Sequence, residues 1–187
     1  MEQIASIREV KSEQAFVFID IVNRWQDMIY NTALSIVQNA QDAEDITQEV
    51  FVQLHKSAET FREESLLSTW LYRVTINKAL DHEKRKKAQK RGGLLRSFFY
   101  KPGDSLDFNH PGVLAENKEK AAVLFRALNE LPASQRIAFI LHKMEGRSYQ
   151  EISEILETSY MAVESLLARA KRNLQKILRS WYETNMK

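Results

Sequence analysis

The sequence has 187 residues, of which 44% are hydrophobic and 28% are charged, and it contains no cysteine. This length allows one domain or two small ones, and the hydrophobic content excludes a globally disordered chain. Without cysteine there is neither a disulfide scaffold nor a thiolate metal site, as is usual in a reducing compartment. The sequence shows neither a signal peptide nor an apolar run of about 18 residues that could span a membrane. We therefore expect a cytoplasmic protein.

The formal net charge is only +2, but the charges are unevenly distributed. Residues 12–64 hold ten acidic and three basic residues, whereas residues 81–96 hold two acidic and seven basic ones. Residues 168–179 hold five basic residues and no acidic one. A single charge run is usually a solvated surface, but two separate basic clusters favour a polyanion as a partner.

The first half of the chain has helical periodicity. Apolar residues from Phe16 to Ile36 predict a long first helix that ends near Asn39. A second helix is predicted from apolar residues at spacings of three and four: Ala43, Ile46, Val50 and Leu54. Its other faces then carry acidic residues: Asp42, Glu44, Asp45 and Glu49. Ser68 is predicted to cap a third helix. The buried side of that helix is Leu71, Val74 and Ile76 or Leu80.

A change of composition separates this half from the next. Four of the five glycines and two of the three prolines fall within residues 92–112, which is typical of a linker. Five large apolar residues lie in or beside the same stretch, and we expect a partner or the domains to cover them: Leu94, Leu95, Phe98, Phe99 and Phe108. We predict two domains, 12–90 and 118–182, joined by a flexible linker at 91–117.

The second half begins with a predicted helix from Ala121 to Leu128, and Pro132 opens another that ends near Gly146. Residues 148–151, Ser-Tyr-Gln-Glu, have the pattern of a capping box. The polar turn at 157–159 then separates two short amphipathic stretches, the second starting at Ser159. Two helices joined in this way form a helix-turn-helix, which places its second helix in the major groove of DNA. A plain helical hairpin is the alternative, and the basic residues after Arg169 argue against it.

In this order the motifs resemble the bacterial sigma-70 family, specifically the small extracytoplasmic-function sigma factors that keep only regions 2 and 4. Residues 42–51 resemble region 2.2, which docks on the clamp coiled coil of the RNA polymerase β′ subunit. Residues 61–65, 68–73 and 77 resemble region 2.3 and its preceding loop, which open the −10 element and hold a flipped base. Residues 128–136 and the helix-turn-helix resemble region 4, which reads the −35 element and touches the β flap.

The resemblance, which covers residues 15–181, implies an all-α fold of two small helical domains. It implies core RNA polymerase, promoter DNA and an anti-sigma factor as partners, and no cofactor. The implied polymerase-binding residues are Asp42, Asp45, Gln48 and Glu49. The implied −10 residues are Phe61, Arg62, Ser65, Trp70, Arg73, Asn77 and Lys78. The implied −35 residues are Ser148, Tyr160, Met161, Glu164, Ser165, Ala168, Arg169 and Arg172.

Two of these assignments carry an alternative. Trp70 and Phe61 can be core aromatic residues rather than DNA contacts. The recognition helix also departs from its relatives, because Glu164 and Leu166 stand where cations are usual. A carboxylate can accept a hydrogen bond from a cytosine amino group but repels phosphate, so the −35 sequence read by common members should not be transferred.

Other classes of protein are less favoured. The histidines are scattered and show no metal-ligand spacing: His55, His82, His110 and His142. The sequence has no glycine-rich phosphate loop and no nucleophile elbow, so we expect no catalytic or metal site. A stand-alone helix-turn-helix regulator remains the rival interpretation. It explains residues 148–179 but leaves the acidic face at 42–49 without a role.

Overall fold

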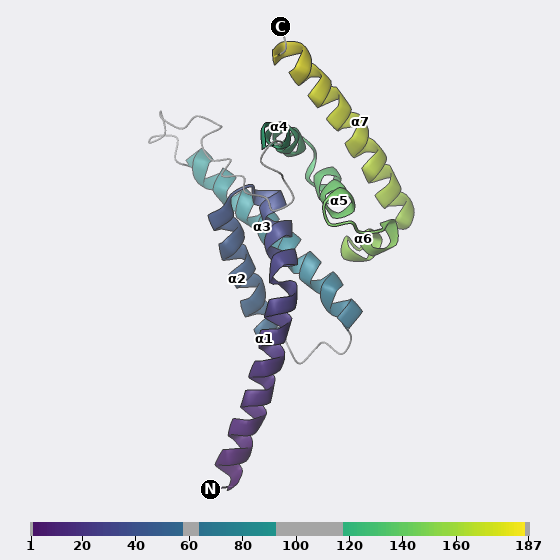
Figure 1. Cartoon of the computed structure of the whole chain (residues 1–187). Helices are drawn as coiled ribbons and strands as arrows, with labels where there is room; N and C mark the ends of the chain where they lie inside the picture. The colour runs from purple at the N-terminus through teal and green to yellow at the C-terminus, as the bar shows by residue number, and fades with distance from the viewer. Residues whose placement is uncertain (1, 58–63, 93–117, 186–187) are drawn as a thin grey trace.

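The computed structural model describes the backbone of residues 2–57, 64–92 and 118–185, and every element in these ranges is a helix (Figure 1). Side chains are described for residues 18–57, 67–89 and 120–184. Three helices form the first half: α1 (Glu2–Val37), α2 (Ala40–Ser57) and α3 (Glu64–Gly92). Four form the second: α4 (Lys118–Asn129), α5 (Ala133–Lys143), α6 (Tyr149–Ile155) and α7 (Tyr160–Asn185). Nearly all of the predicted linker lies outside the described residues.

The first half is a bundle in which α2 and α3 pack on α1, whose N-terminal part projects beyond the body (Figure 1). The turn from α1 to α2 uses Gln38, which has a left-handed φ of 55°. Asn39 then caps α2, because its Oδ1 accepts a hydrogen bond from the backbone N–H of Asp42 at 2.9 Å. The buried side predicted for α2 is confirmed, as all four residues are at most 2% exposed: Ala43, Ile46, Val50 and Leu54.

The predicted start of the third helix was wrong. Ser68 lies inside α3, which begins at Glu64. An acidic residue suits the positive end of a helix dipole, so Glu64 is a favourable first residue. Leu67 adds a turn to the apolar side, since it precedes Leu71 by four residues and is 8% exposed. The helix therefore gains buried area by starting one turn earlier than the serine suggested.

The second half follows its sequence signals closely. Pro132 stands at the N-cap of α5 rather than inside its first turn, and Gly146 closes the following turn with a φ of 67°. The capping box is confirmed: Ser148 Oγ accepts from the Glu151 N–H at 3.2 Å, and Glu151 Oε2 accepts from the Ser148 N–H at 2.8 Å. Helices α6 and α7 then form the helix-turn-helix, with Glu157 in its turn at a left-handed φ of 50°.

One hydrophobic cluster runs through both halves. It joins apolar residues of α1, α2 and α3 to residues of α5, α6 and α7, including Ile140 and Ile152. Helices α3 and α6 are in contact, as are α1 and α5. A second, smaller cluster packs α4 on α7 through Phe125, Leu128 and Leu174. The two halves predicted from composition therefore pack as one body.

Candidate functional site

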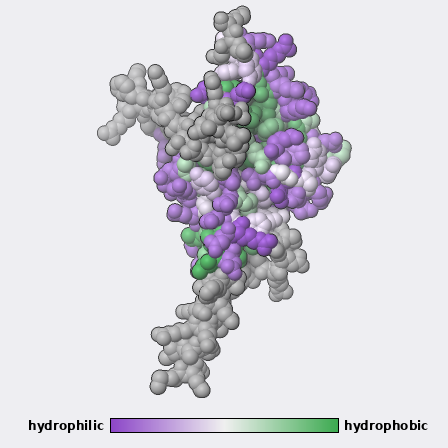
Figure 2. All heavy atoms as spheres, viewed as in Figure 1, coloured by the Kyte–Doolittle hydropathy of each residue, from purple (hydrophilic) through white to green (hydrophobic). Residues whose placement is uncertain are grey.

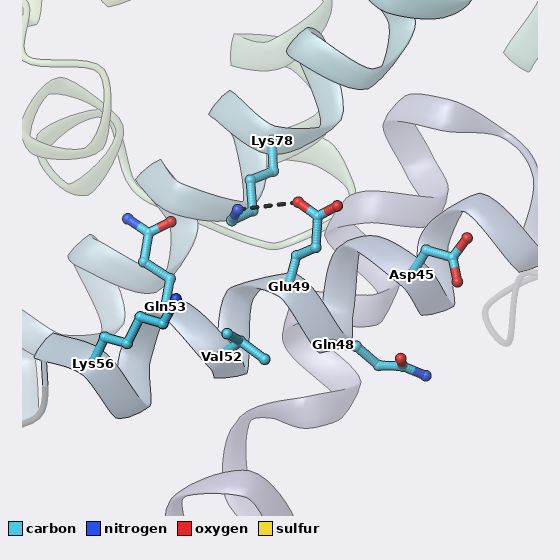
Figure 3. Close-up of a pocket in the computed structure, with 7 residues that line it drawn as sticks. All are labelled: Asp45, Gln48, Glu49, Val52, Gln53, Lys56 and Lys78. Atoms are coloured by element: carbon cyan, nitrogen blue, oxygen red, sulfur yellow. Dashed lines mark hydrogen bonds and ion pairs between the residues drawn. The ribbon is translucent and has the colours of Figure 1, made fainter.

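The acidic side of α2 borders an open groove of about 640 Å³, which Figure 3 shows in close-up. Seven residues line it: Asp45, Gln48, Glu49, Val52, Gln53, Lys56 and Lys78. Lys78 extends from α3 and donates to Glu49 Oε2 at 3.1 Å, while Asp45 and Gln48 point away from it (Figure 3). The groove is therefore lined by the side chains of Asp45 and Gln48 and, next to them, by an ion pair that joins α2 to α3.

Three of these lining residues were not predicted. Val52, Gln53 and Lys56 follow Asp45 and Glu49 at the spacing of one helix face, so the sequence contained the signal. Val52 is an apolar residue that is 55% exposed, which gives the groove an apolar patch beside its two carboxylates and two lysines.

Asp42 differs from the other acidic residues predicted on this face. Its carboxylate accepts a hydrogen bond from Lys86 at 2.6 Å and lies 3.5 Å from His82 Nε2, both on α3. The side chain is only 17% exposed. Asp42 therefore anchors the basic end of α3 to the start of α2, and the groove does not include it.

The predicted −10 residues do not lie together in the structure, and two of them fall outside the described residues. Phe61 and Arg62 lie outside the described residues, and Ser65 is described only as part of the α3 backbone. Trp70 is half-buried and packs against the shared core, in keeping with the core alternative. Asn77 is exposed on α3. It lines a cleft of about 420 Å³ between α3 and the second half.

Arg73 lies at the same cleft, where it contacts the second half. Its guanidinium pairs with Glu157 at 2.6 Å and donates to the main-chain oxygens of Glu154 and Ile155 at 2.5 and 3.2 Å. A cation at the C-terminal end of a helix interacts favourably with the helix dipole. Arg73 therefore caps α6 from the opposite half of the protein.

The helix-turn-helix presents the outward face that its spacing predicted. Five residues of α7 turn away from the core: Met161, Glu164, Ser165, Ala168 and Arg172. Met161 is 71% exposed. The guanidinium of Arg169 donates to the Ser165 main-chain oxygen at 3.1 Å, and the ring of Tyr160 lies tilted against that of Tyr149 with centroids 5.6 Å apart. Leu166 instead lines the cleft against α3, so it does not share this face.

Two carboxylates near the helix-turn-helix have pKa values that are shifted in opposite directions. Backbone and side-chain hydrogen bonds from Ser148 lower the pKa of Glu151. Burial raises the pKa of Glu145, against the hydrogen bond that its carboxylate accepts from Tyr72 Oη at 3.2 Å. Burial likewise raises the pKa of Tyr72. The Tyr72–Glu145 contact is a second polar link between the two halves.

None of the described helices is long and apolar enough to cross a membrane. No group of three or more histidine, aspartate or glutamate residues in the described part of the chain could hold a metal ion.

Comparison with known proteins matches both halves. Residues 21–89 match the model of Sigma-70 region 2, and residues 122–174 match that of Sigma-70 region 4. The chain is 28% identical over 162 residues to RNA polymerase sigma-H factor of Pseudomonas aeruginosa, covering 84% of both chains. It is 27% identical over 174 residues to ECF RNA polymerase sigma-E factor of Escherichia coli K12, covering 91% of this chain and 90% of the relative.

Two solved structures share the fold. The sigma factor RpoE from Bartonella quintana, in complex with the anti-sigma factor NepR, is similar with a TM-score of 0.63 and 23% identity, over 87% of this chain and 96% of that one. CnrH, in complex with the cytosolic domain of CnrY, is similar with a TM-score of 0.61 and 23% identity, over 87% and 88%.

Proposed function

Because the chain belongs to the sigma-70 family, in its extracytoplasmic-function branch, we propose that it is a sigma factor that binds core RNA polymerase and directs promoter recognition, melting and transcription initiation. The observation that carries this proposal is the order of the two matches on one chain, region 2 at 21–89 and region 4 at 122–174. The protein acts by binding rather than by catalysis, in the cytoplasm, where polymerase and chromosome are.

The α2 groove is the surface that we assign to polymerase. Its exposed polar residues Asp45, Gln48 and Glu49 suit basic residues of the β′ clamp coiled coil, and Val52 adds apolar contact. Asp42 acts there indirectly, by holding α2 and α3 together. The second half would contact the β flap.

The DNA-binding assignments divide between the two halves. On α3, Arg73 and Lys78 would follow phosphates, while Asn77 would take part in a pocket for a flipped −10 base, together with Phe61, Arg62 and Ser65. On α7, the outward face from Tyr160 to Arg172 would enter the major groove at the −35 element. Ser148 would contribute mainly by capping α6.

An anti-sigma factor is a further partner by analogy. The similar RpoE structure is a complex with the anti-sigma factor NepR, and the similar CnrH structure is a complex with the cytosolic domain of CnrY. No described residue identifies the corresponding partner of this chain.

Copurification with cognate core polymerase tests the proposal directly, and run-off transcription on genomic fragments then locates the promoters. The stand-alone regulator, our second candidate, would bind duplex DNA without polymerase and would not copurify with it. Binding to core followed by specific transcripts supports a sigma factor. Specific duplex binding with no affinity for core would instead support the regulator.

A further inference from the structure

The start of α7 carries an exposed apolar tip, which consists of Tyr160 and Met161. We propose that this tip reads a thymine in the −35 element, by contact of Met161 with the C5-methyl group of the base. The inference rests on the proposed function, because it takes α7 to be the helix that enters the major groove. It adds to that function the kind of base that one part of the element must contain.

Exposed large apolar side chains are uncommon on this molecule, and the face seen in Figure 2 is mostly hydrophilic. Among the described residues there are five: Ile19, Val52, Tyr160, Met161 and Tyr182. Of these, only Tyr160 and Met161 are neighbours in the chain, with exposed fractions of 51% and 71%. Contiguous apolar surface that stays in water marks a binding site, whereas single exposed apolar residues are normal.

The tip is held in place by the residues around it. Ser159 caps α7, because its Oγ accepts a hydrogen bond from the Ala162 N–H at 3.2 Å. The ring of Tyr160 lies against that of Tyr149, with centroids 5.6 Å apart. The Tyr149 ring in turn meets the ring of His142 edge to face, with centroids 5.1 Å apart. Because a pre-organised surface loses less freedom on binding, a tip held in this way suits a specific contact.

Duplex DNA is the partner that fits this position. In a helix-turn-helix, the N-terminal residues of the second helix contact base edges in the major groove, and the tip lies at this end of α7. Further along the helix, residues 168–179 hold five basic residues and no acidic one, which suits the phosphates that border the groove. Two side chains are too small a patch for a stable protein–protein interface, which buries about 1,200 Å² or more.

The chemistry of the tip favours thymine over the other bases. Residues 160–168 contain no lysine and no arginine, so the first two turns of α7 lack the side chains that make the commonest contact with guanine. Thymine is the one base that presents an apolar group, its C5-methyl, in the major groove. The side chain of Met161 is unbranched and has three rotatable bonds, so it adapts readily to the shape of such a group.

Glu164 locates the thymine within the element. It is exposed and lies three residues after Met161, which is a rise of about 4.5 Å along the helix. Successive bases of one strand are about 3.4 Å apart along the DNA axis, so the base that faces Glu164 should adjoin the thymine. A carboxylate accepts a hydrogen bond from the amino group of cytosine. Met161 and Glu164 together therefore select adjacent thymine and cytosine.

Replacing thymine by uracil removes the methyl group and leaves base pairing unchanged, so it tests the contact directly. Each thymine in the −35 element of a transcribed promoter is replaced in turn. Fluorescence anisotropy then measures the affinity of the holoenzyme, the chain bound to core polymerase, for each duplex. The parent should lose affinity about fourfold at one thymine, as expected when one methyl group is taken out of apolar contact. That thymine should adjoin the base whose preference changes in Glu164→Lys.

Substitutions of Met161 assign the methyl effect to this side chain. Met161→Ala should bind the thymine and uracil duplexes equally, whereas Met161→Leu keeps an apolar side chain and should retain most of the difference. The matched control is Tyr182→Ala, which removes an exposed apolar side chain near the other end of α7 and should keep the full difference. Both positions are exposed, so circular dichroism should show unchanged helicity in all three variants.

Three results would overturn the methyl contact: a parent that tolerates uracil at every thymine, a difference that persists in Met161→Ala, or one that is lost equally in Tyr182→Ala. A sensitive thymine apart from the base that Glu164 reads would overturn its placement. A chain that does not bind core polymerase would contradict the proposed function instead. The comparison is then made with the chain alone, on duplexes that it selects from random sequence, and no binding to any duplex would overturn the methyl contact as well.

Discussion

Lys78 Nζ on α3 lies 3.1 Å from Glu49 Oε2 on α2, so one ion pair joins the helix assigned to −10 DNA to the helix assigned to polymerase. The two side chains are 24% and 49% exposed. At this exposure an ion pair contributes at most about 1 kcal/mol to stability. A partner that offers either residue a better counter-charge can therefore replace this pairing at little cost, which suits a position between a surface assigned to polymerase and one assigned to DNA.

The polymerase assignment predicts the effect of charge reversal in the groove. Asp45→Lys with Glu49→Lys should abolish binding to core polymerase, because the groove would then repel the basic residues of its partner. Helicity should be unchanged, since neither carboxylate is buried. Affinity for core is measured by fluorescence or copurification. Glu44→Lys, an exposed change on the same helix outside the groove, is the control. Unchanged core affinity in the double variant would remove the assignment.

The melting assignment predicts a defect that depends on the template. Asn77→Ala should weaken open-complex formation on duplex promoters more than it weakens binding to core, because the amide would help hold the flipped base. A template with a pre-melted bubble should largely restore open-complex formation, since the unpairing cost has already been met. Asp81→Ala, one turn along α3 and also exposed, is the matched control. Equal defects on duplex and bubble would show that Asn77 has a structural role.

The position of Glu164 on α7 predicts that its substitution changes the base preference at the −35 element. The residue is exposed on α7, between Met161 and Ala168 on the outward face. Glu164→Lys should raise general DNA affinity and steepen its salt dependence, as one more cation displaces counterions. It should also shift the preference at one −35 base by about 1–3 kcal/mol. Binding-site selection with holoenzyme measures this shift.

The control for this change is Glu183→Lys, which adds the same charge near the other end of α7. This control should raise the affinity for DNA without altering the preferred −35 sequence. If selection with the Glu164→Lys holoenzyme returned the parent −35 motif, Glu164 would have no part in reading the sequence.

The half-buried carboxylate of Glu145 predicts how stability varies with pH. Burial raises its pKa in the folded chain, so folding favours the protonated form. The stability that this group contributes is then fully present below its unfolded pKa, which is about 4.3. It is lost as pH rises through the raised folded pKa. Glu145→Gln keeps an acceptor for Tyr72 and should flatten this part of the pH profile.

Urea unfolding at a series of pH values measures the free energy of unfolding for this test. Glu130→Gln, an exposed carboxylate in the loop before α5, is the control and should leave the profile unchanged. Glu151 acts with the opposite sign, because hydrogen bonds from Ser148 lower its pKa. Its contribution is present above the unfolded pKa and lost as pH falls through the folded one. A profile that keeps its slope in Glu145→Gln would assign the dependence to another group.

The sequence alone determined most of the helices and the helix faces on which several candidate residues lie, because both follow from local chemistry. Spacings of three and four located the buried side of α2, and the Ser148–Glu151 pattern located the capping box that starts α6. The outward face of α7 followed from the same periodicity. The early start of α3 could not be predicted in this way, because the extra turn is stabilised by burial of Leu67 only where α3 packs on the core.

Only the tertiary structure decided how the two halves meet and what this does to individual charges. Arg73 and Lys78 carry the same charge on one helix, yet Arg73 caps α6 and Lys78 pairs with Glu49. Asp42 and Asp45 lie on one acidic stretch, yet Asp42 is held by Lys86 while Asp45 borders an open groove. These partners are many residues apart in the chain, and the free energy of each contact depends on burial and distance, which a linear pattern of residue types does not contain.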